Sequence, residues 1–356
     1  MAKDYPKELS SLILSLIESG GSDLHLSVGR HPTIRVSGVL APLSKNPILT
    51  PEDTEGLMLA MVDEKQKEGA YKQGEIDFAY KFEDKARFRC NAFKERGFWG
   101  VAMRFIPAQI RKLEELRLPD MLKNFATKQQ GFFLVVGPTG HGKSTTLASM
   151  VDVVNHETSQ HIVTIEDPIE YLFVQDKSII AQREVGYDTQ GFPRALRSMF
   201  RQDIDVAMIG EMRDPESIAI AVTAAETGHL VLSSLHTNNA GQTIDRIIDS
   251  FPPGQQGQIR LQLAGSLLGI FSQRLIPRIA GGLIPAYELL IANTAVRNLI
   301  REGKTHELNI IIETSSEDGM ISLNTSLLNL VRGGEISMDN ALAYSLQPEA
   351  LTELSQ

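Results

Sequence analysis

The sequence lacks several features that mark secreted and membrane proteins. It has a single cysteine, Cys90, so no disulfide can form within the chain, which fits a reducing compartment. No uninterrupted apolar stretch approaches the ~20 residues needed to span a bilayer. Residues 1–20 hold a short apolar segment with acidic and polar breaks and no small-residue cleavage site, which favours an amphipathic helix over a signal peptide. We therefore expect a cytoplasmic protein.

The sequence also has no long run of lysine or arginine. Its formal net charge is −9 and its pI is about 5.5. A protein that grips a nucleic acid duplex usually carries a concentrated basic patch. We expect no nucleic acid partner and favour a protein partner, although an acidic protein can still have a basic ring lumen. No internal repeat is present, which argues against a solenoid.

The chain of 356 residues is too long for one compact core, so two domains are expected. Residues 1–106 predict an α+β domain. Several of its strand-like runs alternate apolar and polar residues, as in 86–90, which is typical of a half-exposed antiparallel sheet. The strand-like runs are 24–28, 33–40, 76–82, 86–93 and 99–106, and helical periods fall at 7–18 and 52–68. Residues 107–130 predict a linker and one short helix.

The spacing of apolar residues changes after Gly131. Continuous apolar runs alternate with segments of helical length, a pattern that indicates a parallel sheet covered on both faces. The apolar runs are 132–136, 161–165, 206–209 and 230–234. Residues 131–356 are thus expected to form one α/β domain, mainly helical beyond Phe251, with C-terminal helices over about 255–356.

The run 132–136 leads directly into a phosphate-binding motif. Residues 137–144 read GPTGHGKS, which is G-x-x-x-x-G-K-[ST] between a predicted strand and a predicted helix. The glycines let backbone N–H groups surround phosphate oxygens, and the start of the helix adds positive charge. Lys143 would reach the β- and γ-phosphates of ATP, and the Ser144 hydroxyl would bind Mg²⁺. The predicted nucleotide-binding residues here are Gly137, Pro138, Thr139, Gly140, His141, Gly142, Lys143, Ser144 and Thr145.

Two acidic sites follow the neighbouring strands. Glu211 follows 206–209 after Gly210, where it can act through Mg²⁺ or its waters, whereas Asp203 and Asp205 lie at the other end of that strand. The run 161–165 is followed by the acidic cluster EDPIE, residues 166–170, in which one carboxylate could deprotonate the attacking water. Spacing alone leaves both Glu166 and Glu170 open as this base.

Two histidines flank the run 230–234. His229 precedes it and His236 follows it, an odd separation that places their side chains on opposite faces of a strand. A zinc site is therefore not expected, since the lone cysteine lies in the first domain. Chemistry alone favours ordinary surface or core histidines, with a γ-phosphate sensor as the alternative for His236.

These motifs resemble the secretion ATPase superfamily, and within it the type IV pilus retraction ATPases, over nearly the whole chain. Residues 137–148 resemble the family's Walker A segment, 164–170 its Asp box, 195–214 its Walker B region and 224–240 its His box. Residues 20–38 resemble its PAS-like N-terminal domain. The resemblance implies an α/β fold, with a RecA-like P-loop NTPase core, a smaller PAS-like α+β domain and a helical C-terminal region.

The resemblance also implies roles for individual residues. Glu170 corresponds to the catalytic glutamate, Glu211 takes the magnesium-coordinating role with Ser144, and His229 and His236 sense or contact nucleotide. The family works as a ring of six in which arginines from another domain or subunit complete each ATP site. The matching candidates are Arg87, Arg89 and Arg104 in the N-terminal domain, and Arg246 and Arg278 in the ATPase domain.

A C-terminal segment carries the resemblance to retraction ATPases in particular. Residues 295–302 read AVRNLIRE, one conservative change from the AIRNLIRE helix that separates retraction from assembly ATPases. As a pattern alone it is an amphipathic helix. The departures from the family are His141 for serine, Ile204 for proline and Ser234 for threonine, and none removes a catalytic group.

The expected function is MgATP hydrolysis by a homohexamer that powers pilus retraction and twitching motility. The implied partners are a platform protein of the inner membrane, at whose cytoplasmic face the ring would sit peripherally, and a paralogous retraction ATPase. The alternatives are an accessory retraction ATPase and another secretion or assembly ATPase. A nucleotide-regulated scaffold without catalysis is disfavoured by Lys143, Glu170 and Glu211.

Overall fold

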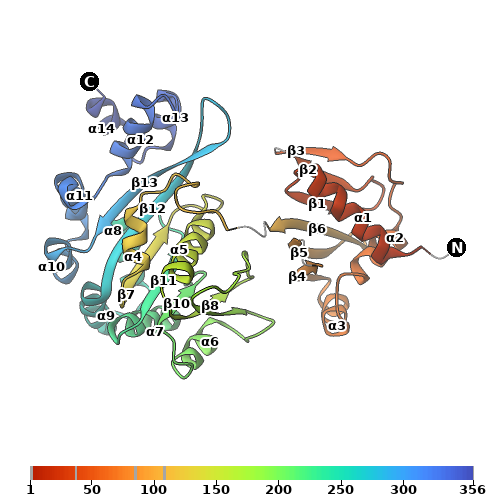
Figure 1. Ribbon diagram of the computed structural model, residues 1–356, viewed down its shortest axis with the longest axis horizontal. Coiled ribbons are helices and arrows are strands. Elements are labelled where there is room, and N and C mark those ends of the chain that lie inside the picture. The colour runs from red at the N-terminus through yellow and green to blue at the C-terminus, as the bar shows by residue number, and fades with distance from the viewer. Residues whose placement is uncertain (1–2, 37, 84–85, 107–109, 356) are drawn as a thin grey trace. The chain divides into compact units, whose positions relative to one another are not determined.

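The computed structural model describes residues 3–36, 38–83, 86–106 and 110–355 (Figure 1). The chain divides into two compact units. The first comprises Met1–Gln109 and Pro168–Leu172, and the second comprises Ile110–Asp167 and Phe173–Gln356. The division falls in the predicted linker 107–130, of which residues 107–109 lie outside the described part.

The first unit is an antiparallel sheet with helices, as predicted. The sheet has the order β3-β2-β1-β6-β5-β4. Its strands are β1 (Asp23–Leu26), β2 (Thr33–Val36), β3 (Val39–Pro42), β4 (Glu75–Phe82), β5 (Ala86–Glu95) and β6 (Phe98–Ile106). Alternation in β5 buries Phe88, Cys90 and Ala92 in the core, while Arg89 is exposed.

Two predicted elements of this unit are each divided in the structure. The predicted strand 33–40 forms β2 and β3, which pair as antiparallel neighbours, and Ser37 between them lies outside the described residues. The predicted helix 52–68 forms α2 (Pro51–Leu59) and α3 (Glu64–Gln73). The break occurs because Asp63 and Gln66 form a capping box that starts a new helix. Helix α1 (Tyr5–Glu18) matches the predicted first helix.

The second unit is built on a seven-stranded sheet with the order β13-β12-β7-β11-β10-β8-β9. The strands are β7 (Gly131–Val136), β8 (His161–Glu166), β9 (Ile179–Glu184), β10 (Val206–Ile209), β11 (Leu230–Leu235), β12 (Leu267–Pro277) and β13 (Leu283–Ile291). Neighbours pair in parallel except β12 and β13. Every residue of β7 is buried, and a separate apolar cluster covers each face, which confirms the predicted doubly covered parallel sheet.

Helices connect the parallel strands and cover the sheet in Figure 1. They are α4 (Met121–Ala126), α5 (Lys143–Glu157), α6 (Phe192–Met199), α7 (Pro215–Glu226), α8 (Ala240–Asp249) and α9 (Pro253–Ser266). The C-terminal helices are α10 (Thr294–Glu302), α11 (Leu308–Thr314), α12 (Leu323–Arg332), α13 (Met338–Tyr344) and α14 (Pro348–Leu354), with short 3-10 turns η1 (Thr305–Glu307) and η2 (Ser316–Asp318). No helix in the described ranges is long and apolar enough to cross a bilayer.

The prediction of a mainly helical segment beyond Phe251 was wrong for residues 267–291. These form the long hairpin of β12 and β13, which adds to the sheet beside β7. The turn between them depends on Gly281 and Gly282, which have φ values of +85° and +78° that other residues rarely adopt. The C-terminal helices α12 to α14 pack on this hairpin around Ile276 and Ile284. Strand β9 was also not predicted.

Candidate nucleotide-binding site

The phosphate-binding motif forms the turn between β7 and α5, as predicted. Gly137, Gly140 and Gly142 have φ values of +145°, +81° and +83°, so the turn needs residues without a side chain. At Gly137 the space also forbids one, because a Cβ atom would lie 2.3 Å from the carbonyl oxygen of Gln273. The backbone is thus shaped as a phosphate cradle, with the start of α5 at its base.

Lys143 is buried at the start of α5 and its ammonium folds back over the loop. The residue is 7% exposed, and its Nζ donates a 2.9 Å hydrogen bond to the carbonyl oxygen of Pro138. The same Nζ lies 3.2 Å from Nδ1 of His236, and the Thr139 hydroxyl lies 3.3 Å from that nitrogen. The loop lysine therefore contacts the residue that follows β11.

His236 also contacts the predicted magnesium ligand. Its Nε2 lies 3.3 Å from Oε2 of Glu211, which follows β10 and also forms an ion pair with Arg213. A lysine ammonium only donates, so Nδ1 of His236 accepts and the ring proton sits on Nε2, facing the Glu211 carboxylate. The chain Lys143, His236, Glu211 thus joins the loop to the carboxyl ends of two neighbouring strands.

The two glutamates that spacing left open as the base belong to different units of the structure. Glu166 ends β8, is 6% exposed, and accepts hydrogen bonds from the hydroxyl of Thr164 (2.7 Å) and Nε2 of Gln182 (3.3 Å). It is therefore at the same edge of the sheet as the loop. Glu170 belongs to 168–172, which groups with the first unit, and its catalytic role stays a prediction.

His229 does not join this group within the chain. It precedes β11, at the end of the strand opposite His236, roughly 20 Å away at ~3.3 Å per residue. Its Nδ1 lies 3.1 Å from the carbonyl oxygen of Ala224, and its ring meets Phe200 edge-on at 5.5 Å. The two histidines of the predicted His box thus lie at opposite ends of strand β11.

The two candidate arginines of the second unit also lie outside the loop contacts. Arg246 is exposed on α8. Arg278 follows β12 and donates through Nε and Nη2 to the Glu335 carboxylate at 2.8 and 2.6 Å. Arg117 binds the same carboxylate at 2.7 Å, and the hydrogen bonds from both guanidinium groups lower the pKa of Glu335. Arg278 is thus tied to the loop between α12 and α13.

The candidate arginines of the first unit come from adjacent strands of its sheet. Arg89 is exposed on β5, and Arg87 is half-buried on the same strand. Arg104, on β6, donates from Nε to Oδ1 of Asp23 at 2.9 Å, yet its side chain remains 71% exposed. Arg89 and Arg104 pair directly across the strands, so both present guanidinium groups from neighbouring positions.

The donors around the loop fit a magnesium ion. Ser144 is exposed at the second position of α5, while Thr145 beside it is half-buried. Glu211 supplies a carboxylate from the end of β10. A hydroxyl oxygen and a carboxylate are hard ligands of the kind that Mg²⁺ takes together with phosphate and water oxygens.

Sequence reasoning missed the contribution of β12 to the loop. Gln273 is 3% exposed; its Nε2 donates to the His141 carbonyl oxygen at 2.9 Å, and its Oε1 accepts from the Thr146 hydroxyl at 2.7 Å. No local pattern marks Gln273, because its partners lie more than a hundred residues away in the sequence. Only the pairing of β12 with β7 brings them together.

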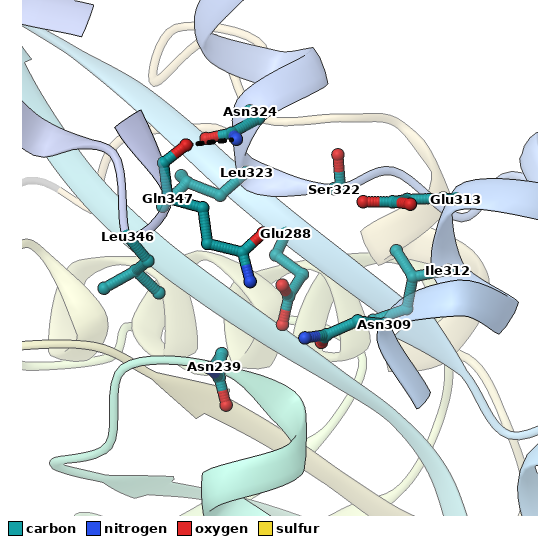
Figure 2. Close-up of a pocket in the computed structure, with 10 residues that line it drawn as sticks. All are labelled: Asn239, Glu288, Asn309, Ile312, Glu313, Ser322, Leu323, Asn324, Leu346 and Gln347. Carbon is teal, nitrogen blue, oxygen red and sulfur yellow. Dashed lines mark hydrogen bonds between the residues drawn. The ribbon is translucent and has the colours of Figure 1, made fainter. Parts of the chain in front are cut away.

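A separate small cavity lies between β13, the start of α8 and the C-terminal helices (Figure 2). Its volume is about 40 Å³. It is lined by Asn239, Glu288, Asn309, Ile312, Glu313, Ser322, Leu323, Asn324, Leu346 and Gln347. Glu288 is 7% exposed, its Oε1 accepts from the Ala240 N–H at 2.8 Å, and burial raises its pKa to about 7. This carboxyl caps α8, the helix after the His box.

The parallel sheet, the loop between β7 and α5, and the acidic residue at the end of β10 define a RecA-like P-loop NTPase. The family described as Type II/IV secretion system protein matches residues 6–320. The chain belongs to this family.

Individual relatives match over nearly the full length. The chain is 42% identical to the type IV pilus retraction ATPase PilT of Pseudomonas aeruginosa, over 96% of this chain and 99% of the relative. It is 41% identical to the type IV pilus ATPase PilU of the same organism, over 95% and 88%. A crystal structure of the pilus retraction motor PilT with bound ADP matches with a TM-score of 0.91 at 46% identity, covering 97% of this chain and 98% of the other.

Proposed function

We propose that this protein is an ATP-driven motor for type IV pilus retraction. The observation that carries the proposal is the contact chain Lys143, His236, Glu211 at the loop, which supports the proposed roles of Lys143 at the phosphates and Glu211 at the magnesium ion. The similarity of the whole protein to a retraction motor crystallised with ADP supports a nucleotide as the ligand. The reaction is hydrolysis of MgATP to ADP and phosphate, coupled to mechanical work.

Each residue at the loop has a role that follows from its chemistry. The backbone amides between Gly137 and Ser144 bind the phosphates, and Lys143 leaves Pro138 to neutralise the β- and γ-phosphates. Ser144 and Glu211 bind the magnesium ion. His236 hydrogen-bonds to Lys143 and Glu211, so its contacts can change when the γ-phosphate is released. Glu170 is the proposed base that activates water.

We further propose that the active form is a homohexamer at the cytoplasmic face of the inner membrane. In a ring, arginines of the first unit, Arg87, Arg89 and Arg104, would supply positive charge to the phosphates. Arg246, Arg278 and His229 lie away from the loop of their own chain and would act at subunit contacts. The pilus platform protein is the proposed docking partner, with a paralogous retraction ATPase as a second one.

A steady-state phosphate-release assay tests the chemistry. The wild-type protein should hydrolyse MgATP, and Glu170→Gln should lose at least 100-fold in kcat while it still binds a fluorescent ADP analogue. If Glu170→Gln hydrolyses at the wild-type rate, Glu170 is not the base. Glu166→Gln is then the next variant, since Glu166 lies buried at the loop edge.

The identity to PilU, 41% against 42% to PilT, favours an accessory retraction ATPase as the second candidate function. A deletion of the gene distinguishes the two. Loss of twitching with surplus pili supports the main retraction motor, and retained twitching supports the accessory one. Cells without pili would indicate an assembly ATPase and contradict both.

A further inference from the structure

The phosphate-binding loop is fastened to strand β12 by two hydrogen bonds at one residue, His141. Its carbonyl oxygen accepts from Nε2 of Gln273 at 2.9 Å. Its ring nitrogen Nδ1 accepts from the backbone N–H of Leu275 at 2.9 Å. The backbone bond can form with any residue at this position, but the ring bond depends on the histidine side chain.

The ring bond requires one protonation state of His141. A backbone N–H can only donate, so Nδ1 carries no proton and the ring is the neutral tautomer with its proton on Nε2. Burial, with Arg274 and Lys143 nearby, lowers the pKa of His141, which favours this neutral form at pH 7. The ring also packs in a T-shaped arrangement with Tyr344 of α13, with ring centroids 6.4 Å apart.

The β12 side of the contact is itself held by strand pairing and a further hydrogen bond. Leu275 lies in the long antiparallel pair of β12 with β13, where it is opposite Pro285, and the Gln273 side chain accepts a 2.7 Å hydrogen bond from the Thr146 hydroxyl. The loop lies directly on this strand, since a Cβ at Gly142 would meet Nε2 of Gln273 at 2.9 Å. A loop residue bonded to such a support loses freedom before any ligand arrives.

We propose that His141 is a positioning residue, whose imidazole holds the phosphate-binding loop against β12 in its nucleotide-ready shape. The inference rests on the proposed nucleotide-binding function and deepens it. A loop ordered in advance loses less entropy when the phosphates bind, so affinity rises. The bond is present in both the ground state and the transition state, so its loss raises KM for ATP more than it lowers kcat.

The side chain needed for this bond is specific. Asparagine carries an oxygen at nearly the same distance from the backbone as Nδ1, so it can accept from Leu275 N–H. Leucine fills similar space without an acceptor. Serine ends one bond too early to reach the same point. The three variants His141→Asn, His141→Leu and His141→Ser therefore separate the hydrogen bond from the volume of the ring.

The test measures the Kd of a fluorescent ADP analogue and the KM and kcat for MgATP. We expect His141→Leu and His141→Ser to weaken ADP binding and raise KM by about 3- to 10-fold, as the loss of one hydrogen bond implies. The fall in kcat should be smaller, and His141→Asn should recover most of the affinity. His306→Leu, at an exposed histidine, is the control for histidine loss.

Two outcomes would overturn the inference. One is equal ADP affinity in the wild type, His141→Leu and His141→Ser, and the other is His141→Asn binding as weakly as His141→Leu. Thermal unfolding of each variant shows whether it is folded, and the serine variant is the fallback if leucine does not fit. The failure of the proposed function looks different, because the wild-type protein itself would then neither bind ADP nor hydrolyse ATP.

Discussion

The guanidinium of Arg297 donates a 2.6 Å hydrogen bond from Nη1 to the carbonyl oxygen of Ala264, near the end of α9. The same guanidinium donates to the carbonyl oxygens of Gly265 at 2.6 Å and Leu267 at 2.8 Å, and its Nε donates to the carbonyl oxygen of Ala292 at 2.9 Å. The last carbonyls of a helix lack partners within the helix. A side chain of α10 thus caps α9 at the point where β12 begins.

Much of the AVRNLIRE helix therefore serves the fold of its own chain. Val296 and Ile300 are fully buried at 0% exposure, and Arg297 is committed to carbonyl oxygens. Asn298 and Arg301 are exposed and hydrogen-bond to each other at 3.0 Å. Any partner that binds this helix must contact its exposed residues. The buried residues and Arg297 keep α9 and β12 in place.

Replacement of Arg297 should therefore destabilise the protein. Arg297→Met removes the guanidinium N–H donors and leaves partly buried carbonyl oxygens without a hydrogen-bond partner. We expect a loss on the order of 2 kcal/mol in the free energy of unfolding. Urea denaturation of the second unit measures it. Arg301→Met is the matched control and should change stability by less than about 0.5 kcal/mol, because it is exposed. Equal effects of the two changes would contradict the capping role.

The glycines of the phosphate-binding loop should differ in their tolerance of a methyl group. Both Gly137 and Gly140 have positive φ, so alanine is strained at either position. Only at Gly137 would the new Cβ collide with backbone, 2.3 Å from the Gln273 carbonyl oxygen, whereas at Gly140 nothing lies within 4 Å. We expect Gly137→Ala to abolish binding of a fluorescent ADP analogue, and Gly140→Ala to weaken it by a smaller factor. The opposite order would show that the clash with β12 does not set the loop shape.

Glu288 should make stability depend on pH. Its folded pKa is raised from 4.5 to about 7 by burial, so the folded state holds a proton that the unfolded chain releases between these values. Stability therefore falls as pH rises from about 4.5 to 7, by up to about 3 kcal/mol at 1.36 kcal/mol per pKa unit. The loss is complete above pH 7.

Glu288→Gln removes this dependence while its amide oxygen can still accept from the Ala240 N–H. We expect the variant to have a higher melting temperature than the wild type at pH 8, with the difference shrinking toward pH 5. Thermal unfolding across this pH range measures the difference. A melting-temperature difference that stays constant with pH would mean that Glu288 is not the titrating group.

The parts of the site that are local in sequence could be predicted. The strand, loop and helix around Lys143 are one continuous segment, and Glu211 and His236 each come within two residues of the end of a strongly apolar strand. Parallel strands bring such positions to one edge. The contact between His236 and Glu211 then follows from the neighbouring positions of β10 and β11.

The contributions of β12 could not be predicted in the same way. Residues 267–277 read LLGIFSQRLIP, a run whose apolar periodicity does not separate a buried strand from a buried helix. The choice is made by pairing with β7 and β13, which is information from distant segments. Gln273 and Leu275 contact the loop only because of that pairing. Spacing likewise left both Glu166 and Glu170 open as the base.

The two histidines of the predicted His box allow a final prediction, because they lie at opposite edges of the sheet. His236 contacts Lys143, Thr139 and Glu211, so His236→Ala removes an acceptor from the loop lysine and a donor to the Glu211 carboxylate. We expect a loss of roughly 100-fold in kcat for MgATP, since removal of one positioned hydrogen-bond donor at developing charge costs an enzyme about 10²–10³ in kcat. ADP binding should weaken only a few-fold.

His229→Ala is the matched comparison. His229 contacts Ala224 and Phe200, about 20 Å from the loop, so its loss should leave the ADP affinity of the chain within two-fold of the wild type. A fall in kcat at unchanged ADP affinity would then support a role for His229 across a subunit contact. Weakened ADP binding in a folded His229→Ala protein, as large as that in His236→Ala, would contradict the placement of the two histidines at separate edges.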